Sequence, residues 1–132
     1  MEDCIFCKII QEKIPAEKIY EDSEMLAFLD INPVQPGHLL LIPKSHHEWM
    51  TDVPDKLLSQ LYIKTKDLMK TVKKSFNADY IVLSVVGVDV PHFHIHIIPR
   101  FKNDGLQNFW PTKKYKDENE MSQTADKIRE NL

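Results

Sequence analysis

The stretch PHFHIHIIPR, residues 91–100, places a histidine at every second position among apolar residues. Side chains alternate between the two faces of a β-strand, so His92, His94 and His96 would share one face. The other face would carry Phe93, Ile95 and Ile97. The pattern predicts a half-buried strand that packs its apolar face on a core and presents its histidines. Pro99 would end it, because proline has no amide N–H for the ladder.

The patterns on either side of this stretch predict an α+β domain. Strand-like segments occupy residues 17–22, 25–33, 38–44, 80–86 and 93–98. Helical segments occupy residues 4–13, a long stretch that begins near Asp52 and Pro54, and residues 118–132. We expect an antiparallel five-stranded sheet with one long helix crossing between its strands and a C-terminal helix.

Apolar residues recur every three or four positions along both longer helices. The expected face of the long helix carries Leu57, Leu61, Leu68, Val72 and Phe76. That of the tail helix carries Met121, Ala125, Ile128 and Leu132. This spacing predicts amphipathic helices, with the lysines of the long helix in solvent.

Length and charge narrow the class of protein. A chain of 132 residues with 42% hydrophobic residues suits one compact domain over residues 1–132. Twenty acidic against 17 basic residues give a net charge of −3, which argues against binding a nucleic-acid polymer. The start MEDCIFCKII is acidic where a signal peptide is basic, and no apolar run approaches the ~18 residues of a membrane span. We expect a cytoplasmic protein without membrane association.

Cys4 and Cys7 form a Cys-x-x-Cys motif near the start of the chain. A redox motif normally follows a strand and opens a longer helix, so zinc binding is the better interpretation. Ordinary buried thiols are the alternative. A closed tetrahedral zinc shell needs two more ligands, and His46 or His47 in IPKSHHEW can supply one.

The strand histidines allow several chemical roles. A neutral imidazole can act as a nucleophile, a general acid or base, or a metal ligand, and spacing alone does not choose among them. Asp30 in FLDINP suits a turn ahead of Pro33 as well as a functional carboxylate. His38 follows Gly37 at a strand entrance and by itself indicates little.

Together these residues resemble the histidine-triad (HIT) nucleotide-binding family, in its zinc-bearing, bacterial-type branch. The family signature His-φ-His-φ-His-φ-φ, with φ apolar, is matched at residues 92–98. The resemblance extends through CIFCKII, IPAEKIYED, LAFLDINP, GHLLLIPKSH and IIPR, and more loosely through the region of Trp110. It implies a HIT-like fold over nearly the whole chain.

The resemblance also implies catalytic roles for three histidines. In the family the middle histidine, here His94, attacks the α-phosphate of a nucleotide and forms a nucleotidyl-histidine that water then resolves. A neutral imidazole suits this step if an acceptor, commonly a backbone carbonyl, holds its other nitrogen. His96 would donate to a phosphate oxygen, and His38 would complete the polar cluster.

For the nucleotide itself, the resemblance implies that Asp30 holds the ribose hydroxyls. Apolar residues would sandwich the base, at the positions of Phe6, Ile9, Phe28, Leu29 and Ile31. Apolar walls with one carboxylate would favour a purine without any basic patch.

Zinc-bearing members of the family use two cysteines, a histidine after the third strand and the first triad histidine. The resemblance therefore implies a structural zinc on Cys4, Cys7, His46 and His92, with the chemistry left to His94. It also implies a homodimer.

One segment departs from the family pattern. Members commonly carry Asn-x-Gly, a longer Gly-rich loop and a Gln before the triad, whereas SVVGVDVPH has Val85 for the Asn, keeps Gly87 and has no Gln. Asp89 would stand near the leaving group, where its charge would either repel phosphate or favour a cationic leaving portion.

We therefore expect a hydrolase or transferase that cleaves the α-phosphate bond of a nucleoside monophosphate conjugate, such as a phosphoramidate, an acyl nucleotide or a dinucleoside polyphosphate. One alternative is a metal-dependent hydrolase with the strand histidines on a catalytic zinc. The other is a nucleotide-sensing or interaction module with vestigial activity.

Overall fold

The structure, a computed structural model, describes residues 3–106 and 112–132. They fall into two compact units, Met1–Lys102 and Asn103–Leu132. The region of Trp110, where the family resemblance is loosest, lies outside the described residues. The expected single domain over residues 1–132 stays a prediction.

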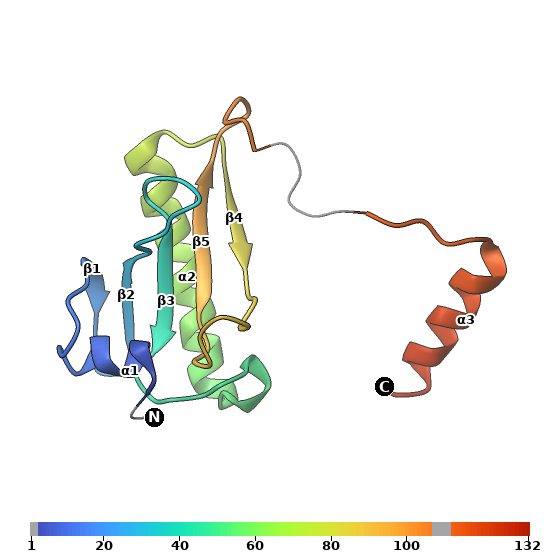
Figure 1. The fold of residues 1–132 in the computed structure, drawn as a ribbon, viewed down its shortest axis with the longest axis horizontal. Helices are drawn as coiled ribbons and strands as arrows, with labels where there is room; N and C mark the ends of the chain where they lie inside the picture. Colours follow the sequence, from blue (N-terminus) through green and yellow to red (C-terminus); the bar gives the residue numbers. More distant parts are fainter. Residues whose placement is uncertain (1–2, 107–111) are drawn as a thin grey trace. The chain divides into compact units, whose positions relative to one another are not determined.

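The first unit contains the predicted five-stranded antiparallel sheet. Its strands are β1 (Lys18–Glu21), β2 (Met25–Leu29), β3 (Leu39–Pro43), β4 (Tyr80–Ser84) and β5 (Ile95–Arg100). They lie in the order β1-β2-β3-β5-β4, and each neighbouring pair is antiparallel (Figure 1). The α+β class and the sheet expected from the sequence are confirmed.

The long helix α2 (Asp55–Phe76) covers one face of the sheet (Figure 1). Its buried residues are Leu57, Leu61, Thr65, Leu68 and Val72, close to the predicted face. They share a core cluster with sheet residues that include Ala27, Leu41, Phe93, Ile95 and Ile97. The apolar side of the histidine stretch therefore packs against α2, as its alternation predicts.

The other face of the sheet is covered near His92 and His94 by the short helix α1 (Ile5–Ile10). A second cluster joins Cys4, Phe6, Cys7 and Ile9 to the sheet residues Leu26, Phe28, Leu40 and Ile42. Because α1 lies over this face, His92 and His94 are buried rather than presented to solvent. The expectation of a half-buried strand is wrong here.

Pro99 does not end the last strand, contrary to the prediction. It pairs with Ile81 inside β5. Asp79 donates its amide to the Arg100 carbonyl at 3.0 Å, so the backbone of Arg100 faces β4 and that of Pro99 faces the β3 side. On that side the ladder stops at Ile97, and the missing N–H removes no strand pairing.

The long helix begins slightly later than predicted. Asp52 belongs to a short 3-10 helix, η1 (Met50–Asp52), and Pro54 is the N-cap residue of α2. At the other end Phe76 is 44% exposed, but its ring lies against Gly37. Gly37 has φ +97°, and a Cβ at this position would lie 2.4 Å from the Phe76 ring. Only glycine fits this turn into β3.

The second unit contains the predicted tail helix, α3 (Glu118–Arg129). Asp117 caps it, since its side chain accepts from the Glu120 amide at 2.8 Å. The apolar positions Met121 and Ile128 of this helix are exposed.

Candidate active site and metal centre

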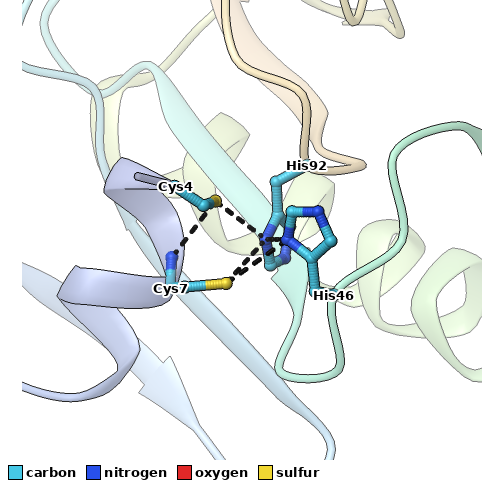
Figure 2. A group of neighbouring side chains, drawn as sticks. All are labelled: Cys4, Cys7, His46 and His92. Carbon is cyan, nitrogen blue, oxygen red and sulfur yellow. Dashed lines mark hydrogen bonds between the residues drawn. The ribbon is translucent and has the colours of Figure 1, made fainter. Parts of the chain in front are cut away.

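Two cysteines and two histidines from three segments converge beside the sheet (Figure 2). Cys7 comes from α1 and Cys4 is the N-cap residue of that helix, His46 comes from the loop after β3, and His92 from the segment before β5. Cys4 Sγ lies 3.4 Å from His92 Nδ1, and Cys7 Sγ lies 3.3 Å from His46 Nδ1. The two imidazole Nδ1 atoms are 3.2 Å apart, and Cys7 Sγ is 3.6 Å from that of His92.

These distances suit a single small metal ion. Zinc holds thiolate sulfur at about 2.3 Å and imidazole nitrogen at about 2.0 Å, so ligand atoms at tetrahedral corners lie roughly 3.3–3.8 Å apart. The sulfur and nitrogen atoms of this cluster have nearly that separation. Both cysteines are free thiols, so no disulfide competes for them. The four residues therefore can hold a metal ion.

The backbone sets His92 in the form that a metal requires. Its Nε2–H donates to the Pro43 carbonyl at 2.8 Å, which leaves the Nδ1 lone pair directed at the cysteines. Burial lowers the pKa of His92 to about 4, so the ring is neutral near pH 7. Burial also raises the pKa of Cys7 to about 11, helped by the hydrogen bond of its thiol to Cys4. A bound cation would supply the positive charge that a thiolate needs there.

The structure separates the two adjacent histidines that the motif left open. His47 turns away from the cysteines, and its Nε2 lies 2.9 Å from Ser45 Oγ. Its backbone carbonyl accepts from the Phe93 amide and so joins this loop to the histidine strand. His46 is the residue within ligand distance of Cys7.

His94 has its tautomer fixed by the backbone of the segment before β5. Its Nδ1 lies 2.7 Å from the carbonyl oxygen of His92, which can only accept, so Nδ1 carries the proton. The lone pair of the neutral ring is then on Nε2. Phe6 packs edge-on against this ring at 5.1 Å between centroids, which restricts its orientation. One acceptor thus holds Nδ1, and Nε2 is the ring nitrogen that can offer a lone pair.

His38 and His96 are hydrogen-bonded to each other. The Val34 amide donates to His38 Nδ1 at 3.0 Å, so the proton of a neutral His38 is on Nε2. That nitrogen lies 2.9 Å from His96 Nδ1, which therefore accepts and leaves the His96 proton on Nε2. His96 can then offer an N–H donor to a ligand. The sequence did not indicate the Val34 contact, because it depends on the path of the 30–38 loop.

Asp30 lies beside His38. Its Oδ2 is 3.6 Å from His38 Nε2, and its Oδ1 accepts from the Asn32 amide at 2.9 Å. The Asp30 amide donates in turn to the His38 carbonyl at 3.0 Å. The residue is therefore both a turn-forming aspartate and a carboxylate beside His38, so the two interpretations of its motif are compatible.

The apolar residues expected around the base do not all lie on one face of the sheet. Phe6, Ile9 and Phe28 form part of the α1-side cluster, and the Phe6 and Phe28 rings are 5.5 Å apart. Ile31 is 85% exposed beside Asp30. Leu29, in contrast, packs with the α2-side cluster, because strand alternation turns it to the opposite face from Phe28. Its side chain does not join the others.

The three strand histidines do not meet at one point. Among the residues that the structure describes, two groups have ligand atoms close enough for a metal: the cysteine cluster with His92, and Asp30 with His38 and His96. His94 belongs to neither. This division gives no support to a catalytic zinc held by all three strand histidines.

We predict that acid weakens the fold through His96. Burial lowers its pKa to about 4, from an ordinary value of 6.5. Between these values the unfolded chain binds a proton that the folded chain does not, so the free energy of unfolding falls as pH drops from 6.5 towards 4. The loss between pH 7 and 5 is on the order of 1 kcal/mol, since the ring is partly exposed.

His96→Gln should show a smaller Tm difference between these pH values at equal metal content. Identical differences would contradict this assignment.

Comparison with known proteins agrees with this geometry. The HIT-domain family profile matches residues 11–103. An uncharacterized HIT-like protein of Borreliella burgdorferi is 42% identical over 113 residues, 80% of this chain and 81% of that protein. The chain belongs to the HIT family.

Two further relatives have named activities. An adenosine 5′-monophosphoramidase of Saccharomyces cerevisiae is 39% identical, over 83% of this chain and 71% of that protein. An adenylylsulfatase of Arabidopsis thaliana is 38% identical, over 79% of this chain but 55% of that protein. HIT-family hydrolases of nucleotide substrates are thus among the relatives of this protein.

Solved structures agree on the fold. A HIT family protein from Bacillus subtilis has a TM-score of 0.84 at 35% identity and covers 98% of this chain and 97% of its own. A zinc-bound histidine-triad protein from Mycobacterium smegmatis has a TM-score of 0.74 at 26% identity, over 96% and 98% of the two chains. In the described part of this chain, no helix has the length and apolar character needed to cross a membrane.

Proposed function

We propose that this protein is a nucleotidyl hydrolase or transferase that cleaves the α-phosphate bond of a nucleoside monophosphate conjugate through a nucleotidyl-His94 intermediate. One observation carries the proposal: the 2.7 Å contact of His94 Nδ1 with the His92 carbonyl leaves Nε2 as the free nucleophilic nitrogen. Neutral imidazole attacks phosphorus at pH 7 without first losing a proton. A phosphoramidate is the preferred substrate class, with the relationship to the yeast phosphoramidase in support.

His96 and His38 are assigned to the phosphate. The N–H of His96 donates to a phosphate oxygen and stabilises the charge that develops in the transition state. His38 is a positioning residue, since its Nε2 contacts His96 Nδ1 at 2.9 Å and sets the tautomer of that ring.

The nucleoside is placed beside Asp30. The carboxylate accepts from the ribose hydroxyls, and the base lies against apolar residues of the α1 side, with Phe6, Ile9, Phe28 and Ile31 as the wall. A purine is preferred because its larger π surface contacts more of such a wall. The ligand is a small nucleotide, and no nucleic-acid polymer is involved.

A structural zinc on Cys4, Cys7, His46 and His92 completes the proposal. Two thiolates and two imidazoles fill a tetrahedral shell and leave no open position for a reacting water. The zinc-bound mycobacterial relative supports this choice of metal. Zinc would tie α1 to the histidine strand, and the reaction would be left to His94.

Two coarser assignments accompany the site. We place the protein in the cytoplasm, where a reducing environment keeps the two cysteines as thiols. We also assign it a homodimeric state, from its membership of the family. A nucleotide-sensing module with vestigial activity is the second candidate, supported by the departures in the 85–90 loop.

The proposal is tested by incubating the protein with adenosine 5′-phosphoramidate. Release of adenosine monophosphate and ammonia at a rate that rises with protein concentration supports an enzyme. Tight binding without release supports the sensing module.

A second prediction concerns the sugar. Asp30→Ala should weaken binding of a ribonucleotide tenfold or more, because a hydrogen bond to a charged carboxylate contributes about 1.5–3 kcal/mol. A nucleotide that lacks both ribose hydroxyls should lose much less. Calorimetric titration of both ligands measures the difference, and equal losses would remove Asp30 from the ribose site.

A further inference from the structure

The pairing of β4 with β5 brings the loop at residues 85–90 to the candidate active site. Ser84 lies directly opposite His96 in the antiparallel register. Side chains paired in this way lie on the same face of the sheet. Val85 follows Ser84, so the loop begins beside the imidazole assigned to the phosphate.

Two contacts fix the course of this loop. Gly87 has φ +75°, and a Cβ at this position would lie 3.1 Å from the Trp49 ring. Val90 packs against the α1-side cluster that contains Phe6, and its carbonyl accepts from the His92 amide at 2.8 Å. Val90 is therefore held on the same side of the sheet as His94 and His96, and Asp89 directly precedes it.

The loop has an unusual chemical character for a phosphate site. Its exposed side chains are largely apolar: Val85, Val86 and Val88 are 41%, 55% and 76% exposed. From residue 80 to residue 99 the sequence contains no Lys or Arg, and Asp89 is its one acidic residue. No cation of this segment can neutralise a polyphosphate.

The charge of Asp89 reaches the active site. Burial lowers the pKa of His96, whereas the carboxylates of Asp30 and Asp89 act to raise it. Two negative charges therefore act on the ring that the proposed function assigns to the phosphate. A leaving group with further negative charge would be repelled by both.

From this arrangement we infer that Asp89 and the valines of residues 85–90 select conjugates whose leaving group is an amine bearing a positive charge on an apolar chain. The inference rests on the proposed function and names its substrate class.

In the reaction, His94 Nε2 forms a bond to phosphorus as the phosphorus–nitrogen bond of the substrate breaks. The amine leaves with the electron pair and takes up a proton from the solvent. Water then cleaves the phosphorus–His94 bond and releases the nucleoside monophosphate.

The test is a matched series of three adenosine 5′-phosphoramidates. Their amines are 1,5-diaminopentane, n-pentylamine and 5-aminopentanoate, so the tail has similar length and is cationic, neutral or anionic. At low ionic strength kcat/KM should fall in that order, with about a fivefold to tenfold ratio between the cationic and anionic substrates, because exposed charge pairs act weakly. Added salt should reduce the ratio.

Two variants locate the effect. Asp89→Asn should bring the cationic-to-anionic ratio close to one. Asp67→Asn, which removes the same charge from an exposed position on α2, should keep the wild-type ratio. Because the ratio is taken within each variant, a general loss of activity does not disturb it.

The outcomes distinguish a failure of the selectivity from a failure of the proposed function. Equal His94-dependent turnover of all three substrates by the wild type, or a ratio that survives Asp89→Asn, overturns the selectivity while the proposed function stands. If none of the three is cleaved, the proposed function fails and the selectivity fails with it.

Discussion

His94→Ala is expected to abolish turnover, with a loss of at least about 10³-fold in kcat, because it removes the atom that forms the covalent bond to phosphorus. Binding of the nucleoside monophosphate should stay within roughly tenfold of wild type, or about 1.4 kcal/mol. The ribose and base contacts do not involve this ring. Steady-state kinetics together with titration of the product nucleotide measure both effects.

The same variant separates the alternatives. A catalytic-metal enzyme would lose activity together with its metal, so metal content is measured in parallel and should be unchanged. A sensing module would show no turnover to lose. Wild-type activity in His94→Ala would remove His94 as the nucleophile.

Zinc removal has the second largest expected effect, and it acts on stability. We predict one tightly held zinc per chain on Cys4, Cys7, His46 and His92. Structural zinc contributes on the order of 10 kcal/mol of apparent binding energy in small zinc peptides. The stabilisation by zinc would be smaller here, because the clusters on both sheet faces form a core without metal. Even a few kcal/mol would lower Tm by about 10 °C or more.

Single substitutions give the matched comparison. Cys7→Ser should reproduce the loss of zinc and of Tm, because its sulfur lies 3.3 Å from His46 Nδ1 and 3.6 Å from His92 Nδ1. His47→Ala should retain both, since the side chain of His47 contacts Ser45 instead. Metal analysis of protein purified without chelator, followed by thermal unfolding, measures them. A stoichiometry near zero, or activity that follows zinc strictly while the fold does not, would contradict a structural role.

Local patterns predicted most of the fold. The alternation of residues 92–97 correctly assigned Phe93, Ile95 and Ile97 to the α2 side. The same alternation should have separated Phe28 from Leu29, which cannot both line one wall from adjacent strand positions. The placement of Pro99 depended on where β3 stops pairing, and that is a long-range property of the sheet.

The candidate site was predictable in its residue types and less so in its contacts. The motif alone offered both His46 and His47, and the course of the loop after β3 brings His46 to Cys7. The partners that set the ring tautomers are backbone groups: the Val34 amide and the carbonyls of Pro43 and His92. Every residue has a backbone carbonyl and all but proline have an amide N–H, so composition cannot reveal these partners. The Ser84–His96 pairing was likewise hidden, because it requires the strand register.

Capture of the covalent intermediate tests the proposed mechanism most directly. Protein is mixed with excess adenosine 5′-phosphoramidate labelled at phosphorus and quenched within milliseconds to seconds in alkaline denaturant, because a phosphorus–imidazole bond is acid-labile. We predict one labelled adenylyl group on the peptide that contains His94, absent from His94→Ala and retained in His47→Ala. Product release by the wild type with no label on protein at any time, or label on another residue, would contradict it.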